Sequence, residues 1–196
     1  IQPAAGDAGG ALGAALGLWH LELNKERKVN NSDDMNGSFL GPEYTQSEIE
    51  KSLDDSGAKY EVFEEDEIIR KTSSAIAEGK AIGWFQGRME FGPRALGSRS
   101  IIADARSDNM QKKLNLKVKY RESFRPFAPS VISEDLSEWF DLNCDSPYMM
   151  LVAKVARDKC KKMSEEEKLL FGIDQLNVKR SEIPAVTHVD YSARIQ

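Results

Sequence analysis

The chain has 196 residues, 40% of them hydrophobic and 30% charged, which is enough for one medium-sized domain with a fragment or for two small domains. No stretch comes near the roughly 20 consecutive apolar residues that a membrane-spanning helix needs, and a formal net charge of −5 argues against a general nucleic-acid binder. The two cysteines, Cys144 and Cys160, lack metal-ligand spacing and make no disulfide framework, so we expect two ordinary thiols in a cytoplasmic protein.

The chain opens on a glycine- and alanine-rich segment that leads into a predicted helix. Residues 4–17 are mostly small, and apolar residues such as Leu12 and Leu16 recur there with helical spacing. A glycine turn before a helix presents free backbone N–H groups, which suit a phosphate. Asp7 at this turn either caps the helix or holds a metal or a phosphate-bound cation. Residues 1–3 include no initiator methionine and no basic signal region, so we expect a piece of a longer protein.

Helices and strands then interleave without a regular βαβ period, which predicts an α/β domain with a mixed sheet. Residues 24–44 are polar and predict a linker or surface loop, and Thr45 with Glu48 forms a predicted capping box for a helix that ends near Gly57. Residues 159–170 are a charged surface helix or an insertion. Strands are predicted at residues 60–63, 81–86 (buried), 100–103, 127–132 and 148–153, and helices at 64–78, 108–116 (capped by Asp108) and 136–140.

Positive charge is concentrated in residues 88–125. This window holds ten basic and four acidic residues, a balance of +6, which leaves −11 for the rest of the chain. A positive patch on an acidic protein favours a small anionic ligand, because the surrounding field repels an extended phosphate backbone. The alternative is a solvated basic face. The basic residues are Arg88, Arg94, Arg99, Arg106, Lys112, Lys113, Lys117, Lys119, Arg121 and Arg125.

Residues 87–100, here called the first arm, follow a predicted strand and are too long for a simple hairpin. Three glycines and a proline fix its path, and its arginines offer planar forks for phosphate or carboxylate. We expect Glu90 to orient one guanidinium. The alternative is a structural loop whose arginines pair with acidic residues. The side chains predicted to contact phosphate are Arg88, Arg94, Arg99, Ser98 and Ser100.

Residues 117–129, the second arm, combine cations with aromatic residues and two prolines. Alternation along a strand would put Lys117, Lys119 and Arg121 on one face, while the prolines and phenylalanines stiffen the chain around Arg125. Such a segment can bring a lysine to one phosphate and an arginine to another. Neutralising negative charge as it develops is how phosphoryl-transfer sites mostly work.

Three motifs together, in residues 83–97, 121–129 and 184–190, resemble the C-terminal part of the NodU/CmcH-type carbamoyltransferases. The resemblance implies a YrdC-like domain over residues 41–196, with a mixed twisted sheet flanked by helices. Residues 1–40 would be the helical remnant and linker of a preceding ASKHA-type domain. The implied reaction joins carbamoyl phosphate with ATP, giving carbamoyl adenylate and pyrophosphate. The carbamoyl group then passes to a hydroxyl of a sugar-like or antibiotic-like acceptor in the preceding domain.

The resemblance also implies roles for individual residues. Arg94, Lys119 and Arg125 would be the catalytic grips on carbamoyl phosphate and the nucleotide phosphates. For His188 a packed or capping role is the alternative. Tyr191 with the serine after it stands where the family pattern has a smaller Gly-Thr pair. Substrate or nucleotide binding is implied for Arg88, Arg99, Ser100, His188, Asp190 and Arg194.

The resemblance implies ATP and carbamoyl phosphate as substrates, with magnesium. Asp7 would be a metal ligand only in the complete protein, because the histidine ligands expected earlier, in an N-terminal domain that binds a divalent metal such as iron, are absent here. That N-terminal domain is the expected partner, with no membrane and no nucleic acid. The alternative function is a non-catalytic YrdC-like module that recognises nucleotide or RNA.

Overall fold

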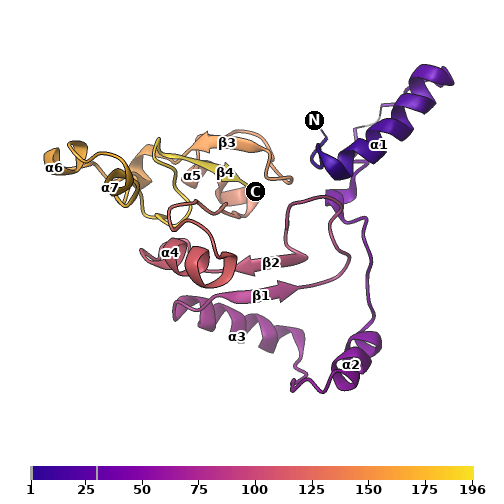
Figure 1. Ribbon diagram of the computed structural model, residues 1–196, viewed down its shortest axis with the longest axis horizontal. Coiled ribbons are helices and arrows are strands. Elements are labelled where there is room, and N and C mark those ends of the chain that lie inside the picture. Colours follow the sequence, from indigo (N-terminus) through magenta and orange to yellow (C-terminus); the bar gives the residue numbers. More distant parts are fainter. Residues whose placement is uncertain (1, 30) are drawn as a thin grey trace. The chain divides into compact units, whose positions relative to one another are not determined.

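The structure is a computed structural model that describes residues 2–29 and 31–196 (Figure 1). Helices and short strands interleave along the chain, which confirms the α/β class. The chain divides into two units. The first comprises Ile1–Phe63 with Trp84–Ser100, and the second comprises Glu64–Gly83 with Ile101–Gln196.

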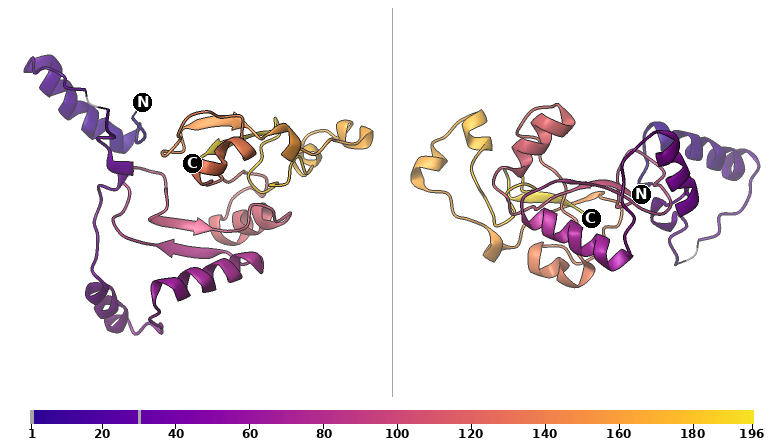
Figure 2. Two further views of the ribbon diagram at one scale, coloured as in Figure 1. Left: turned by 180° about the vertical axis from the view of Figure 1, so that it is seen from behind. Right: turned by 90° about the horizontal axis from the view of Figure 1, so that it is seen from below.

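The elements are short apart from three helices, and Figure 2 shows the same chain from behind and from below. The α-helices are α1 (Asp7–Gly17), α2 (Gln46–Asp55), α3 (Glu65–Ala77), α4 (Met110–Leu114), α5 (Leu136–Trp139), α6 (Glu165–Lys168) and α7 (Ile173–Leu176). The strands are β1 (Ile82–Phe85), β2 (Arg99–Ile102), β3 (Leu151–Lys154) and β4 (Ser192–Ile195). The 3-10 and π helices are η1 (Leu18–Glu22), η2 (Asn36–Ser38), η3 (Asn115–Lys119), η4 (Ser133–Asp135) and η5 (Arg157–Lys159).

The predicted helices of the first half are confirmed where the sequence supplies its own start and stop signals. Thr45 and Glu48 form the reciprocal capping box at the start of α2. Helix α3 carries three acidic residues in its first turn and is followed by Gly79, whose φ of 75° only glycine adopts without strain. The N-cap of α1 is Gly6, so Asp7 is a first-turn residue and its predicted capping role is wrong.

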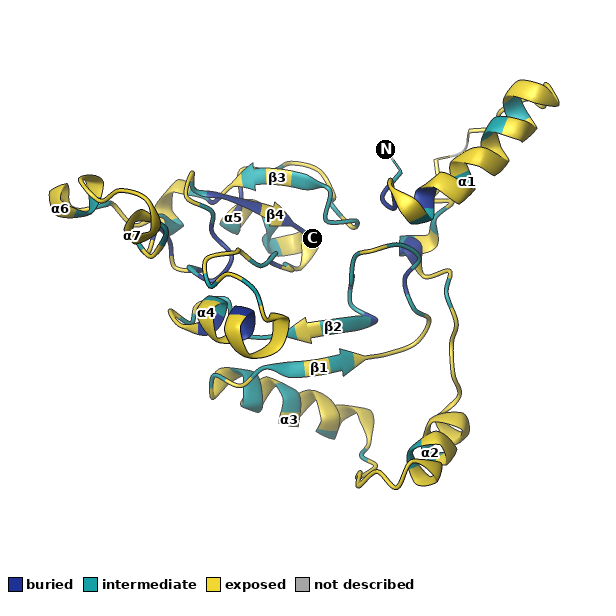
Figure 3. Cartoon of the chain, viewed as in Figure 1, coloured by how far each residue is buried: buried dark blue, intermediate teal, exposed yellow. Residues whose placement is uncertain are grey.

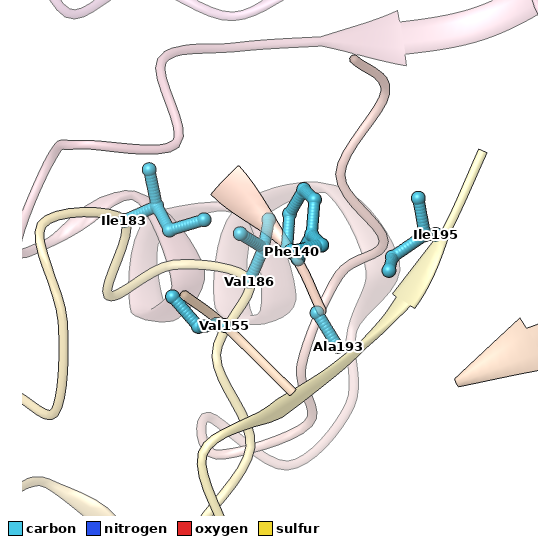
Figure 4. Packing of buried hydrophobic residues seen from close by; sticks show 6 residues of the cluster. All are labelled: Phe140, Val155, Ile183, Val186, Ala193 and Ile195. Atoms are coloured by element: carbon cyan, nitrogen blue, oxygen red, sulfur yellow. The ribbon is translucent and has the colours of Figure 1, made fainter. Parts of the chain in front are cut away.

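The second unit has its core under an antiparallel strand pair. Strands β3 and β4 pair with Val152 opposite Arg194 and Ala153 opposite Ala193. Figure 3 shows β4 as mostly buried, whereas α2 and α3 carry no buried residue. Figure 4 shows the buried side chains of this core, two of which lie on β4 itself, namely Phe140, Val155, Ile183, Val186, Ala193 and Ile195. Burial of these side chains is the main source of stability in this unit.

Three sequence predictions about strands are wrong. The face expected over residues 117–121 does not exist, because the chain continues α4 as the π-helix η3. Residues 60–63 form no strand. Residues 127–132 form none either, because the prolines around Phe127 lack the N–H groups that a ladder needs, and only Pro129 and Val131 bond to Gln196.

Two further details are corrected. The N-cap of α4 is Asn109, and Asp108 instead pairs with Lys179, far along the chain. Strand β1 is half-buried rather than buried, with Phe85 53% exposed. Among the residues described, none of the helices has both the length and the apolar character of a membrane span.

The core of the second unit gives a direct stability prediction. Ile195 on β4 is 1% exposed, and Ile195→Ala should lower the free energy of unfolding by about 2–5 kcal/mol, because it leaves a cavity among side chains that cannot fully collapse. Val152 on β3 is 58% exposed, and Val152→Ala should cost less than about 1 kcal/mol. Urea unfolding followed by circular dichroism measures both. Equal losses in the two variants would show that Ile195 does not lie in a packed core.

Candidate functional site

The first arm is organised around one buried carboxylate. Glu90 is 5% exposed, and its Oε1 accepts hydrogen bonds from the backbone N–H groups of Leu96 at 2.7 Å and Ser98 at 2.8 Å. Its Oε2 accepts from Nε of Arg99 at 3.0 Å. The expected pairing of Glu90 with an arginine of the arm is therefore confirmed. The arm closes into a loop because three groups within it bond to the same side chain.

Hydrogen bonding also sets the protonation of Glu90. Burial raises the pKa of this carboxyl group, but the backbone donors at Leu96 and Ser98 and the guanidinium of Arg99 lower it by more. The pKa of Glu90 thus lies below its ordinary value of 4.5. The carboxylate is charged at neutral pH and acts as an acceptor only.

Most of the polar groups predicted to contact phosphate in this arm bond to the arm itself or to its neighbours. Arg99 donates to the carbonyl oxygen of Gly92 at 2.5 Å, and the hydroxyl of Ser100 accepts from the N–H of Gly97 at 3.0 Å. Arg88 is exposed; it donates to the carbonyl of Gly41 at 2.8 Å and to Glu43 at 3.0 Å. Exposed pairs of this kind exchange readily with a stronger anion.

Arg94 connects the first arm to the start of the chain. It donates to the carbonyl oxygen of Pro3 at 2.9 Å, while its buried Nε has no hydrogen-bond partner among the described residues. Ala4 is 1% exposed and packs against two glycines. A Cβ at Gly92 would lie 2.8 Å from that of Ala4, and a Cβ at Gly9 would overlap the carbonyl oxygen of Ala4. The arm and the first turn of α1 therefore fit together only with glycine at both positions.

The second arm presents its cations to solvent. Lys119 ends the π-helix η3 and is exposed. Arg125 is exposed and forms a 3.0 Å ion pair with Glu122, three residues earlier. Arg121 differs, because its Nε donates to the buried side chain of Asn115 and its guanidinium lies 4.9 Å from the ring centre of Phe127. Three cations of the arm are thus exposed to solvent, namely Lys117, Lys119 and Arg125.

The terminal motif forms a third cluster in the second unit. The Ser192 hydroxyl donates to Oδ1 of Asp190 at 2.6 Å and lies 3.2 Å from Nδ1 of His188. Lys154 donates to the carbonyl oxygen of Asp190 at 2.6 Å and to its Oδ2 at 3.1 Å. Arg194 follows on β4, opposite Val152.

These contacts set two pKa values. The Ser192 hydroxyl and the ammonium group of Lys154 lower the pKa of Asp190 to about 2. Burial lowers the pKa of His188, with Asp190 opposing and Arg194 adding to the effect. At neutral pH the cluster holds a neutral imidazole beside a charged carboxylate. The predicted capping or packing alternative for His188 fits this half-buried position as well as a binding role does.

The second arm and the terminal motif are neighbours through their backbones. The N–H of Phe127 lies 3.5 Å from the carbonyl oxygen of Ala185, and the N–H of Gln196 donates to the carbonyl oxygen of Pro129 at 3.1 Å. Next to the cluster lies an open hollow of about 770 Å³, whose lining includes Lys154, Arg157, Asp190 and Tyr191. The second unit therefore brings Lys119 and Arg125 into one folded unit with His188, Asp190 and Arg194.

Sequence reasoning missed two side chains in this unit. Lys154 directly follows the predicted strand at residues 148–153, and no role was predicted for it. Its pairing with Asp190 joins residues 36 positions apart. Asn115 was not singled out at all, although it is 0% exposed and bonds to the second arm. An asparagine at a predicted apolar helix position is a weak signal, but it could have marked Asn115 as a buried polar residue that needs partners.

The described residues do not by themselves form a metal site. Asp7 is exposed at the start of α1, and the described residues contain no group of three or more His, Cys, Asp or Glu side chains placed to hold a metal. One carboxylate is fewer ligands than divalent ions take in proteins.

Comparison with known proteins adds a family to this geometry. The family described as carbamoyltransferase C-terminus matches residues 73–196. An uncharacterised protein of Synechocystis sp. is 54% identical over 100% of this chain, which covers 32% of that protein. The nodulation protein NolNO of Sinorhizobium fredii is 38% identical over 100% of this chain and 26% of its own length.

A 3'-hydroxymethylcephem-O-carbamoyltransferase of Streptomyces clavuligerus is 40% identical over 63% of this chain and 19% of that enzyme. The chain therefore spans about a third or less of the length of these curated relatives.

Glu90 provides a prediction for the first arm. Glu90→Gln replaces an acceptor oxygen by an N–H₂ group that faces a donor, so it should lower the free energy of unfolding by about 3 kcal/mol at pH 7. Because the pKa of Glu90 is lowered in the folded state, its stabilising contribution is present above the ordinary value of 4.5 and is lost as the pH falls through the folded pKa. The difference between wild type and variant should shrink below pH 4.5, as urea unfolding at several pH values will measure.

A matched control is Glu43→Gln, which removes the exposed partner of Arg88 and should cost less than about 1 kcal/mol at any pH. If the two variants lose equal stability at pH 7, the carboxylate of Glu90 is not the centre of the first arm.

Proposed function

The chain belongs to the carbamoyltransferase family, by its match to the C-terminal part of its members, and on that premise we propose that it forms carbamoyl adenylate from carbamoyl phosphate and ATP. The observation that supports this most directly is the second arm, where Lys119 and Arg125 are exposed on a backbone to which the side chain of Asn115 bonds. This side chain of Asn115 is buried and holds the backbone in place.

The proposed reaction has two steps and consumes one molecule of water. Carbamoyl phosphate, ATP and water give carbamoyl adenylate, pyrophosphate and phosphate. Water cleaves carbamoyl phosphate into carbamate and phosphate, and a carbamate oxygen then attacks the α-phosphorus of ATP as pyrophosphate leaves. Negative charge builds up on the leaving phosphate groups in both steps, and fixed cations nearby stabilise it.

The residues of this chain then divide into binding and supporting roles. In the proposal Lys119 and Arg125 hold the phosphate groups, and the Glu122 carboxylate yields Arg125 to the ligand. Arg94 is proposed as a separate anion contact within the first unit, where its guanidinium donates to the carbonyl oxygen of Pro3. Catalysis comes from positioning and charge neutralisation.

The remaining predicted residues have supporting places in the proposal. Arg88 is available through exchange of its exposed pair with Glu43. Arg99 and Ser100 hold the shape of the first arm through their hydrogen bonds. His188 and Asp190 contact Ser192 in the second unit, and Arg194 lies nearby on β4.

We also propose that the partner is the preceding part of the same full-length protein. In the relatives, two thirds or more of the length lies outside the matched region. Helices α1 and η1 expose an apolar surface for which such a domain is the natural cover, with Leu16, Leu18, Trp19 and Leu21 each 48–77% exposed. The relatives' names mention cephem and nodulation proteins, so the acceptor proposed here is a hydroxyl of an antibiotic-like or sugar-like molecule.

Calorimetric titration of the chain with ATP, magnesium and carbamoyl phosphate tests the proposal. Lys119→Ala and Arg125→Ala should each weaken ATP binding by about tenfold, a loss of about 1.4 kcal/mol, because each removes a charge-assisted contact. Arg70→Ala is the matched control, since Arg70 is 71% exposed on α3 and pairs weakly with Glu67 at 3.7 Å.

A folded chain that binds neither ATP nor carbamoyl phosphate would reject the proposal. Tighter binding of tRNA than of ATP, with a steep dependence on salt, would favour the nucleic-acid module instead.

A further inference from the structure

The buried side chain of Asn115 bonds to three residues of the second arm. Asn115 is 0% exposed and is the first residue of η3. A buried amide side chain must satisfy one carbonyl oxygen and two N–H donors, because an unmet polar group away from water is costly. All three find partners among residues 121–125, and none is left over.

The side chain of Asn115 makes the longer-range contacts. Its Nδ2 donates to the backbone carbonyl oxygens of Ser123 at 3.1 Å and Arg125 at 2.8 Å. Its Oδ1 accepts from Nε of Arg121 at 2.6 Å. The two carbonyl groups are thereby drawn to one nitrogen atom, which bends the chain between them around Asn115.

The backbone of Asn115 holds the start of the same bend. Its carbonyl oxygen accepts from the N–H of Tyr120 and from the N–H of Arg121, the latter at 3.0 Å. Tyr120 has a φ of 49°, a left-handed conformation that a bulky residue adopts only when its surroundings impose it. Residue 115 thus fixes the arm at positions 120, 121, 123 and 125.

Asn115 also separates the cations of the arm into two kinds. Arg121 is engaged by Oδ1 and by the face of Phe127, so it belongs to the scaffold. Lys117 and Lys119 precede the fixed bend, Arg125 lies at its end, and all three are exposed. A neutral amide supports them without adding a negative charge that would compete with an anionic ligand for the same cations.

We infer that Asn115 is a positioning residue, which sets the backbone of the second arm for anion binding before the ligand arrives. The inference rests on the proposed function, since it takes ATP to be a ligand of this arm. A preformed arm binds more tightly than a mobile one, because less conformational entropy is lost on binding.

Asn115→Asp is the sharpest test. Aspartate has the same shape and keeps an oxygen for Arg121, but it replaces the donor Nδ2 by an acceptor that faces two carbonyl oxygens. Asn109→Asp is the matched control, because Asn109 is an exposed N-cap of the neighbouring helix α4 and the charge change is the same. We expect ATP to bind Asn115→Asp at least about tenfold more weakly, and Asn109→Asp within about twofold of wild type.

One readout separates positioning from a general loss of stability. Amide hydrogen exchange at residues 120–125 should be faster in Asn115→Asp, while exchange in β3 and β4 stays as in wild type.

The outcomes are distinct. If folded wild type binds no ATP, the proposed function fails and this inference with it. If wild type binds ATP and Asn115→Asp binds equally well, the inference alone is overturned. Should Asn115→Asp not fold, Asn115→Ser keeps one donor in a smaller side chain, and unchanged ATP affinity and hydrogen exchange in that variant would overturn the inference in the same way.

Discussion

The burial of one negative charge dictates the conformation of the first arm. A carboxylate removed from water is tolerated only when its lone pairs are met by donors, and Glu90 finds them at Leu96, Ser98 and Arg99. The chain has to turn back on itself to supply them. The glycines at positions 92 and 97, with φ of 108° and 121°, allow that turn. The unusual path of the arm is therefore a consequence of solvating Glu90 from within the protein.

The backbone of the second arm is held by a neutral side chain, the amide of Asn115. Asn115 binds carbonyl oxygens rather than N–H groups, and it engages only one of the nearby cations. The difference matters electrostatically. A carboxylate such as Glu90 neutralises an arginine, whereas an amide leaves the net positive charge of its arm unchanged. The first arm is consequently the more self-contained of the two, and the second presents more uncompensated charge to solvent.

The sequence predicted those features whose cause lies within a few residues. The capping box of Thr45 and Glu48, the acidic first turn of α3 and the pairing of Glu90 with an arginine all depend on short spacings. The alternation of Lys117 with Lys119 also looked like a strand, yet the chain is helical there. Periodicity over five residues does not reveal that Asn115 will bond to groups up to ten residues ahead.

Partners that are distant in sequence account for the rest. Asp108 was predicted to cap a helix and pairs with Lys179, and Lys154 gained its role only through Asp190. The family resemblance suggested residues for the proposed chemistry, but not the side chains that hold them in place. The partners of such supports include backbone atoms, as with Asn115 and the carbonyl groups of Ser123 and Arg125, and a residue pattern does not reveal them.

The contact between Ala4 and the two glycines has a mechanical meaning. Close-packed segments with only the methyl group of Ala4 between them transmit displacement with little loss, because neither surface can deform to absorb it. The guanidinium of Arg94 donates a hydrogen bond to the carbonyl oxygen of Pro3, the residue before Ala4. Whatever shifts the first turn of α1 therefore also shifts the loop that carries Arg94. A displacement of α1 accordingly changes the position of the first arm through the contacts of Pro3 and Ala4.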